Sequence, residues 1–240
     1  MSEFKTVLLK FSGPLQSWGT DSHFESRHTD THPSKSGVIG LIAAGLGYSR
    51  DDDAAIQRLN SLFFAVRVDQ RGELLRDFHT AQKNKENGDF DRNYVTNRYY
   101  LQDAVFVVAL GSNDDSLIQD VVHAVTHPYY SLFLGRRSLP PTADLLLGVK
   151  NGEPVSVLND YPWQASEWYR KQISGRKILE IYSDAIGGSC HKSHFRNDLV
   201  KSFSQNNGRK FDARIEAESE IEVKAISSCE SDPNVFHEEG

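Results

Sequence analysis

The order of the apolar segments along the chain constrains its fold more than any other feature. Residues 6–11 are apolar and β-prone and end at a Ser-Gly-Pro turn, and residues 103–110 form a second strongly apolar strand. Between them lie a helical pattern over residues 36–44, a second helical segment that opens with three aspartates, and a strand pattern over residues 63–68. Residues 116–125 carry apolar side chains at helical spacing. This irregular mixture of strands and helices predicts an α+β fold.

A polar stretch interrupts the pattern. Residues 74–80 form a strand pattern, and we predict that they pair with residues 63–68. Over residues 81–98 the apolar signal collapses, which is typical of either a floppy loop or a hairpin that projects from the body. The element order predicts a ferredoxin-like sandwich, with helices on one face of the sheet and the other face free. After residue 150 the secondary-structure pattern is weaker, and we predict a smaller extension of mixed secondary structure.

The charge distribution bears on possible partners. The net charge of −6 speaks at first against a nucleic-acid ligand, but residues 215–240 alone carry a net −7. Residues 161–214 hold ten Lys or Arg against five Asp or Glu. The acidic end is predicted to be a half-exposed strand followed by a solvated tail, with a role in fending off unwanted RNA as the alternative. The remaining body is therefore able to carry basic patches.

The composition also indicates the compartment. No run of about 18 apolar residues is present, so we expect no membrane span. Two cysteines rule out a disulfide framework as the source of stability, and the N-terminus lacks the pattern of a secretory signal. We therefore predict a reduced, cytoplasmic setting.

A His-rich loop precedes the first helix and is a candidate phosphate site. It contains basic side chains and ends at a Ser-Gly pair: His23, Arg27, His28, His32, Lys35, Ser36 and Gly37. Ser36 is predicted to be the helix N-cap, and N–H groups at a helix start with a nearby lysine can bind phosphate. The spacing of a P-loop is absent. The alternative is a capped helix after a solvated loop.

Three further segments combine cations with aromatic residues. Arg76-Asp77-Phe78-His79 ends a strand and could present a stacking face to unstacked bases, or it could bury one alternating face in the core. In the polar stretch basic and aromatic residues alternate, as they do in proteins that bind single-stranded nucleic acid: Arg92, Tyr94, Arg98, Tyr99 and Tyr100. Arg136 and Arg137 stand in a Gly-Pro turn, where adjacent arginines favour phosphate contacts.

Metal and acid–base chemistry are weakly supported. Cys190, His191 and His194 suggest zinc, but no second ligand pair is visible, so we predict neither a metal nor a cofactor. Acid–base cleavage of RNA needs a base near the 2′-hydroxyl and a positioned acid, and no spacing among the nine histidines identifies such a pair. No catalytic residue is assigned.

Four blocks in this chain resemble the CasD family, the type I-E Cascade subunit of the repeat-associated mysterious protein (RAMP) superfamily. The blocks lie in family order between residues 13 and 148: Gly13-Pro14-Leu15-Gln16-Ser17-Trp18-Gly19 followed by Arg27, Pro33-Ser34-Lys35-Ser36-Gly37-Val38-Ile39-Gly40-Leu41, Leu75-Arg76-Asp77-Phe78-His79-Thr80, and Leu134-Gly135-Arg136-Arg137-Ser138-Leu139-Pro140. After about residue 150 the similarity is faint. His32 stands where the family leads us to expect a bulkier apolar residue.

The resemblance implies a fold and a role. It implies an RRM-like domain over residues 1–150 with a β-hairpin thumb at about 81–100, a C-terminal extension over 151–226 and an acidic flexible tail over 227–240. It implies binding of the 5′ handle of the CRISPR RNA (crRNA), contacts with the backbone subunit CasC and the large subunit CasA, and access to target DNA only through the assembled complex. The RNA-binding residues implied by the blocks, with Arg98 from the thumb, are Arg27, Lys35, Ser36, Gly37, Arg76, His79, Arg98, Arg136 and Arg137.

An enzymatic alternative stays open. Type I-C relatives cut repeat RNA without a metal, using a tyrosine, a lysine and a histidine. His79 with Lys83 or Lys85 is the nearest candidate set in this chain. A third alternative is a scaffold whose RNA contacts are incidental.

Overall fold

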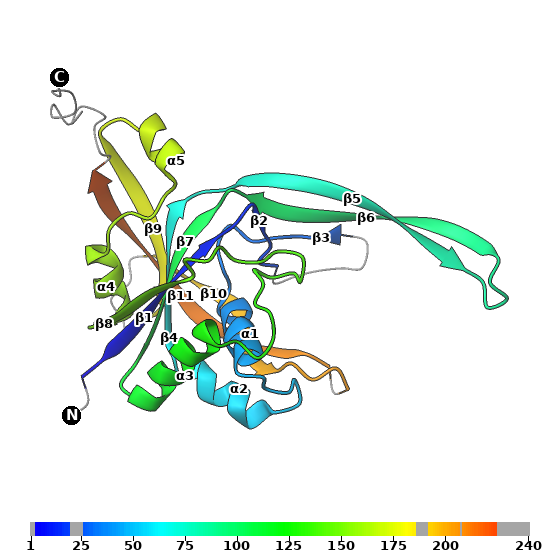
Figure 1. The fold of residues 1–240 in the computed structure, drawn as a ribbon, viewed down its shortest axis with the longest axis horizontal. Coiled ribbons are helices and arrows are strands. Elements are labelled where there is room, and N and C mark those ends of the chain that lie inside the picture. Colours follow the sequence, from blue (N-terminus) through cyan, green and yellow to red (C-terminus); the bar gives the residue numbers. More distant parts are fainter. Residues whose placement is uncertain (1–2, 20–25, 186–191, 207, 225–240) are drawn as a thin grey trace, which may run out of the picture.

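A seven-stranded antiparallel sheet forms the body of the protein (Figure 1). The computed structural model describes residues 3–19, 26–185, 192–206 and 208–224. The strand order is β10-β11-β9-β4-β7-β1-β8. In chain order these strands are β1 (Lys5–Ser12), β4 (Phe63–Gln70), β7 (Val105–Ser112), β8 (Leu146–Asn151), β9 (Arg176–Asp184), β10 (Ser193–Ser202) and β11 (Lys210–Lys224).

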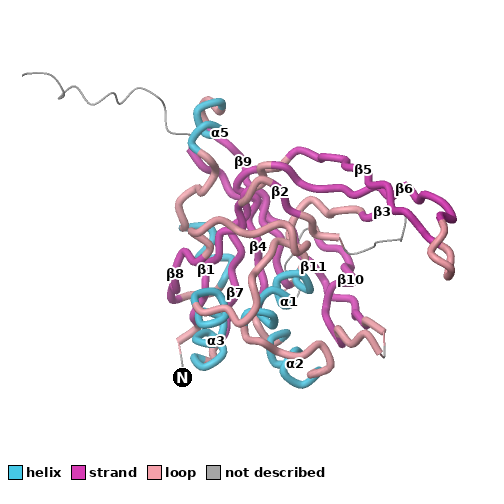
Figure 2. The backbone as a smooth tube through the Cα atoms, turned by 45° about the vertical axis from the view of Figure 1, so that its right-hand side comes forward, coloured by secondary structure: helices cyan, strands magenta, loops and turns pink. Residues whose placement is uncertain are grey.

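Helices pack on both faces of this sheet (Figure 2). On one face lie α1 (Lys35–Gly45), α2 (Asp53–Asn60) and α3 (Asp115–Thr126), which share the main core with inward side chains of β1, β4 and β7. On the other face α4 (Pro154–Asp160) packs Val157 and Leu158 over Leu8 and Ala65, and α5 (Glu167–Gln172) follows it. The expected α+β fold is confirmed, but the expectation of one free sheet face is wrong, because α4 covers its middle.

A long hairpin leaves one end of the sheet. It consists of β5 (Glu73–Asn84) and β6 (Phe90–Gln102), which pair antiparallel along their length, and it projects far from the body in Figure 1. The short strands β2 (Leu15–Gln16) and β3 (Ser26–Arg27) pair with the base of β6. The predicted pairing of residues 74–80 with residues 63–68 is wrong. β4 is buried between β7 and β9, whereas β5 is exposed over most of its length and finds its partner in β6.

Strands after residue 150 enter the main sheet directly. β9 pairs with β4, and β11 and β10 extend the sheet beyond it. Val200 of β10 belongs to the main core. Whether residues 1–150 form a separate folding unit stays a prediction, and residues 227–240 lie outside the described part.

The family block at the N-terminus contributes to the core. Trp18 is 2% exposed and stacks on Phe11 at 5.3 Å between ring centroids, and its Nε1 donates to Gln16. Its role is therefore packing, which agrees with the common use of an aromatic after a strand-ending turn.

Candidate nucleic-acid interface

The loop with the two adjacent arginines is a tight turn pressed against the N-terminal segment. The Leu134 N–H donates to the Leu139 carbonyl at 2.7 Å, and the Leu139 N–H donates to the Arg136 carbonyl at 2.9 Å. Gly135 has a φ of +89°, and a Cβ there would lie 1.7 Å from the carbonyl oxygen of Ser17. This position requires glycine because of both the backbone conformation and the close approach. The turn thereby holds Arg136 at the base of the hairpin.

Arg136 joins β3 to β6. Its Nη2 donates to the backbone carbonyls of Arg27 and Tyr99, each at 3.2 Å, and its guanidinium carbon lies 4.3 Å from the centroid of the Tyr100 ring. The β3–β6 pairing places Arg27 beside Arg98. Within the described part of the chain, Nη1 of Arg136 and Nε of Arg98 are buried and have no acceptor. A buried N–H without an acceptor is costly, so these two groups are a local cost of the packing at this point.

Two exposed arginines complete this group. The side chains of Arg27 and Arg137 are exposed. The His28 ring, next in sequence to Arg27, stacks on Tyr99 with 5.0 Å between centroids and 14° between planes. The structure therefore brings together Arg27, Arg98, Arg136 and Arg137, a set that we call the arginine cluster. The His28–Tyr99 stack was not predicted, because no spacing rule joins residues so distant in sequence.

The side chains of Arg76 and His79 lie on opposite faces of the hairpin. Successive side chains of a strand point to opposite faces, so Arg76 shares a face with Leu74 and Phe78, while His79 lies on the other face. Leu74 and Phe78 are each 65% exposed, so this alternating face is open rather than buried in the core. Arg76 Nε donates to Asn97 Oδ1 at 3.0 Å across the hairpin.

The second face of the hairpin is polar. His79 Nε2 lies 2.6 Å from Asp77 Oδ2, and both side chains are 44% exposed. Further along the hairpin the Arg92 guanidinium carbon lies 4.9 Å from the centroid of the Tyr94 ring, which fits the predicted alternation of basic and aromatic residues. Lys83 lies 3.7 Å from Asp91. The nearest tyrosine–lysine–histidine candidates thus lie along an open ribbon.

The start of α1 is occupied by the protein's own groups. Ser34, not Ser36, is the N-cap, and its side chain accepts from the Gly37 N–H at 3.2 Å. The Lys35 N–H donates to Asp198 Oδ2 at 2.8 Å, and its buried ammonium contacts Asp184 and the Leu62 carbonyl. Because carboxylates already hold the Lys35 N–H and its ammonium, the expectation for Lys35 is corrected, whereas RNA contacts of Ser36 and Gly37 stay predictions.

A buried charge network surrounds that helix start. Arg214 contacts Asp184, Asp198 and Glu216, and Arg196 contacts Asp198 and Glu216 as well. These contacts tie β9, β10 and β11 to α1 through Lys35.

His32 seals one side of the network. Its ring lies flat on Tyr182 at 3.9 Å, and its Nε2 is 3.3 Å from Glu216 Oε2. Burial lowers the pKa of His32, against the opposing effect of its hydrogen bond to Glu216. The apolar residue expected at this position is thus replaced by a flat ring that packs equally well and also contacts a carboxylate.

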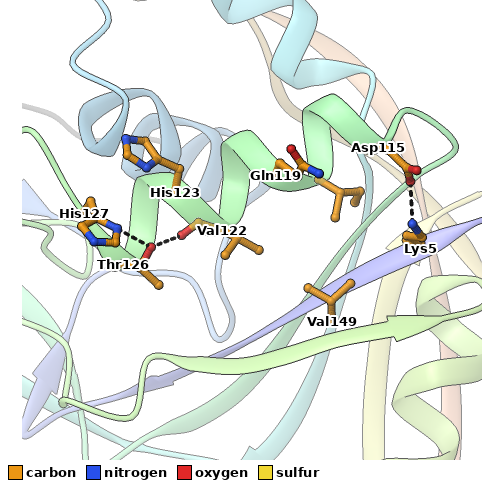
Figure 3. Close-up of a pocket in the computed structure, with 9 residues that line it drawn as sticks. Lys5, Asp115, Gln119, Val122, His123, Thr126, His127 and Val149 are labelled. Carbon is orange, nitrogen blue, oxygen red and sulfur yellow. Dashed lines mark hydrogen bonds and ion pairs between the residues drawn. The ribbon is translucent and has the colours of Figure 1, made fainter.

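A groove of about 480 Å³ runs between α3 and β8 (Figure 3). Figure 3 shows Val122 and Val149 facing each other across it. Lys5 pairs with Asp115 at 2.9 Å, Thr126 bonds to the Val122 carbonyl, and the rings of His123 and His127 stack with 5.4 Å between centroids.

The described residues also bear on metal binding and on membrane insertion. Among the residues that the structure describes, no group of three or more His, Cys, Asp or Glu is arranged to hold a metal ion. Cys190 and His191 lie outside the described residues, so the zinc alternative is untested there. None of the helices in the described ranges is long and apolar enough to cross a membrane.

Comparison with known proteins defines the class and then the family. The large antiparallel sheet with few helices is the architecture of CRISPR complex subunits: a chain of a solved "CRISPR RNA-guided surveillance complex" superposes with a TM-score of 0.74 at 31% identity, covering 92% of this chain and 91% of that one. A solved "Cas protein" gives a TM-score of 0.64 at 30% identity, covering 90% of this chain and 94% of that one.

Residues 6–207 match the family described as CRISPR-associated protein (Cas_Cas5). "CRISPR system Cascade subunit CasD" of Escherichia coli (strain K12) is 35% identical over an alignment of 188 residues, with 72% of this chain and 84% of that protein covered. The chain belongs to the CRISPR-associated Cas5 family, and the resemblance to CasD is confirmed.

Proposed function

We propose that this protein is a non-catalytic subunit of a CRISPR RNA-guided surveillance complex and that it holds the 5′ end of the guide RNA. Family membership and the similarity to a Cascade subunit support the first part. One observation carries the second: the β3–β6 pairing and the Arg136 turn bring four arginines to the base of the hairpin, and two of them, Arg27 and Arg137, are exposed. Phosphate oxygens are suitable acceptors, because guanidinium–phosphate bonds are charge-assisted and often bidentate.

The arginines of the cluster would have different roles in RNA binding. Arg136 uses Nη2 to hold β3 against β6. Arg27 and Arg137 are exposed beside it and would contact phosphates directly. The His28–Tyr99 stack offers an aromatic surface on which an unpaired base could stack. The hairpin would act as the RRM-like thumb that separates the handle from the guide segment.

The non-catalytic part of the proposal rests on the hairpin. His79 has an exposed carboxylate as its partner, and the lysine and the tyrosine on the same face of the hairpin, Lys83 and Tyr94, lie beside Asp91 and Arg92. RNA cleavage would need such groups held near one 2′-hydroxyl. We further propose contacts with CasC and CasA, recognition of target DNA only through the assembled complex, and a cytoplasmic location.

Binding of handle RNA to the full chain tests the proposal. We expect the Arg27→Ala/Arg137→Ala variant to bind RNA with the repeat-derived 5′ handle about a hundredfold more weakly, since each charge-assisted bond is worth about 1.5–3 kcal/mol. Lys201→Ala is a matched control, because Lys201 is 54% exposed and pairs only with Asp212 across β10 and β11. Equal affinities of the double variant and the control would refute the assignment.

Catalysis is tested separately. Incubation of repeat RNA with excess protein in EDTA at neutral pH should leave the RNA intact. Specific scission by the unmodified chain that is lost in His79→Ala would move the protein to the nuclease class.

A further inference from the structure

The strand that carries Arg27 is unusually short. β3 contains only Ser26 and Arg27 and lies beside β6 at the base of the hairpin (Figure 1). Arg136 adds one bond to the Arg27 carbonyl at 3.2 Å. Strands of globular proteins usually span at least about three residues, so contacts outside the β3–β6 pairing matter for the position of this segment.

A second attachment follows directly after β3. The Trp18 N–H donates to Thr29 Oγ1 at 2.9 Å, and the Asp30 N–H donates to the Trp18 carbonyl at 3.2 Å. Trp18 belongs to the main core. These two bonds therefore connect the segment after Arg27 to a fixed point of the fold.

A third attachment comes from β10, more than 160 residues away in sequence. Arg196 Nη2 donates to Asp30 Oδ2 at 2.7 Å. Nη1 of the same guanidinium donates to Glu216 Oε2 at 3.1 Å, and its Nε lies 3.2 Å from Asp198 Oδ2. The carboxylates of Glu216 and Asp198 are fully buried, whereas the Asp30 side chain is 32% exposed. Arg196 thus joins a segment at the surface to two buried carboxylates.

The chemistry of Arg196 makes this attachment the strongest of the three. Its side chain is 10% exposed, so salt screens its pair with Asp30 less than it screens a surface pair. A planar guanidinium can bind several acceptors in one fixed arrangement, whereas an ammonium is a single point charge. Charge-assisted bonds are roughly twice as strong as neutral ones, such as the two bonds to Trp18.

We infer that Arg196 is a positioning residue for RNA binding: through Asp30 it holds the segment that presents Arg27 and His28 to the RNA. The inference rests on the proposed function, which places the RNA at the arginine cluster. A segment that is ordered beforehand loses less entropy on binding than one that the RNA itself must order. Arg196 is largely buried and acts without touching the RNA, so the strands after residue 150 take part in the RNA site.

Asp30→Ala separates positioning from simple electrostatics, because the two predict opposite signs. If only charge mattered, removal of an acid near a site for a polyanion should tighten RNA binding. If Asp30 holds the segment, we expect handle RNA to bind about fivefold more weakly. The slope of log affinity against log salt should also become less steep by about 1, since the phosphate contact of Arg27 is lost. Arg196 keeps Glu216 and Asp198 in this variant, so the buried network remains paired.

Three further variants serve as controls. Asp212→Ala removes an acid from an exposed pair with Lys201 and should leave the affinity unchanged. Asp30→Asn keeps an oxygen that can accept from Arg196, so its affinity should lie between those of Asp30→Ala and the unmodified chain. Adding Arg27→Ala to Asp30→Ala should cost less than about twofold, because both changes remove the same contact.

Trypsin measures the attachment without RNA. Arg27 is exposed, and cleavage after it requires the segment to leave β6. We expect Asp30→Ala to speed this cleavage at least about tenfold, since loss of one charge-assisted bond raises the population of the open segment by that much or more. Asp212→Ala should be cleaved after Arg27 at the rate of the unmodified chain.

The two assays can fail independently. Unchanged cleavage after Arg27 in Asp30→Ala would overturn the attachment, whatever the RNA affinity. Faster cleavage together with equal or tighter RNA binding would show that the attachment does not serve RNA binding, and the inference would fail. If the Arg27→Ala/Arg137→Ala variant bound handle RNA normally, the proposed function would fail and the role of Arg196 in RNA binding with it, while the cleavage rate would still decide whether Arg196 holds the segment.

Discussion

Glu216→Gln removes one buried negative charge from the network that joins α1 to the C-terminal strands. Burial alone would raise the pKa of the Glu216 carboxyl, but the hydrogen bond from His32 and the charges of Arg196 and Arg214 lower it to about 2. Relative to the ordinary value of 4.5, that shift corresponds to about 3 kcal/mol in favour of the charged form. Glutamine resembles the protonated acid, so we expect the variant to lose about that much stability at pH 7.

The pH dependence follows from the same values. A carboxyl with a lowered pKa in the folded state stabilises the fold above pH 4.5 and loses that contribution as the pH falls from about 4.5 towards 2. Burial lowers the pKa of His32, so this residue destabilises the fold at a higher pH than Glu216 does. Below about pH 6.5 the unfolded chain begins to bind a proton at His32 and the folded chain does not. Acidification therefore destabilises the protein in two stages, and Glu216→Gln should reduce the second, to which Asp114, Asp144 and Glu167 also contribute because their pKa values are lowered as well.

Urea unfolding at pH 7 and pH 3, with thermal unfolding alongside, measures both effects. A loss of about 3 kcal/mol corresponds to a decrease in melting temperature of about 6–12 °C for a chain of this size. Glu222→Gln is the matched control on the same strand, because Glu222 is half exposed and its pair with Arg176 should contribute little. Two results would show that Glu216 does not stabilise the fold through this network. One is equal stability of Glu216→Gln and the control at pH 7, and the other is a free energy of unfolding that falls as steeply as in the unmodified chain between pH 4.5 and 2.

Three other changes test the packing around the arginine cluster and the hairpin. Gly135→Ala should abolish folded protein in a circular dichroism assay, because its Cβ would overlap the Ser17 carbonyl. Arg67→Met should cost about 3–5 kcal/mol in urea unfolding, because Arg67 is fully buried and its loss leaves the carboxylate of Asp69 unpaired. Replacing residues 83–92 by a short Gly-Ser turn should change the melting temperature by less than about 4 °C, since this part of the hairpin is mostly exposed.

Much of the fold could be predicted because its central strands are buried on both faces. The apolar runs at 6–11, 63–68 and 103–110 correspond to β1, β4 and β7, which are adjacent in the sheet. Such runs carry a strong local signal. The hairpin was placed too narrowly, at 81–100 instead of the full β5–β6 ribbon, because an exposed strand has no apolar alternation that marks its ends.

The candidate site could be predicted only in part. The turn with Arg136 was identified from its composition, but its contacts with the carbonyls of Arg27 and Tyr99 depend on strand pairing that no local pattern encodes. The error at Lys35 has the same origin. Its partners Asp184 and Asp198 are about 150 residues away in sequence, and a lysine at a helix start has the same local signal whether it faces phosphate or a buried carboxylate.

A chain with a net charge of −6 can carry anion-binding surfaces because its charges are unevenly distributed: residues 215–240 alone carry a net −7. In the buried network three cations and three anions neutralise one another: Lys35, Arg196 and Arg214 with Asp184, Asp198 and Glu216. Because these six charges sum to zero, the groups outside the network carry the whole net charge of −6. Salt screens exposed charges beyond about 8–10 Å, so a ligand responds to the local sum rather than to the total. At the arginine cluster the local groups are guanidinium ions, two of them exposed, which makes this place the expected contact for a polyanion.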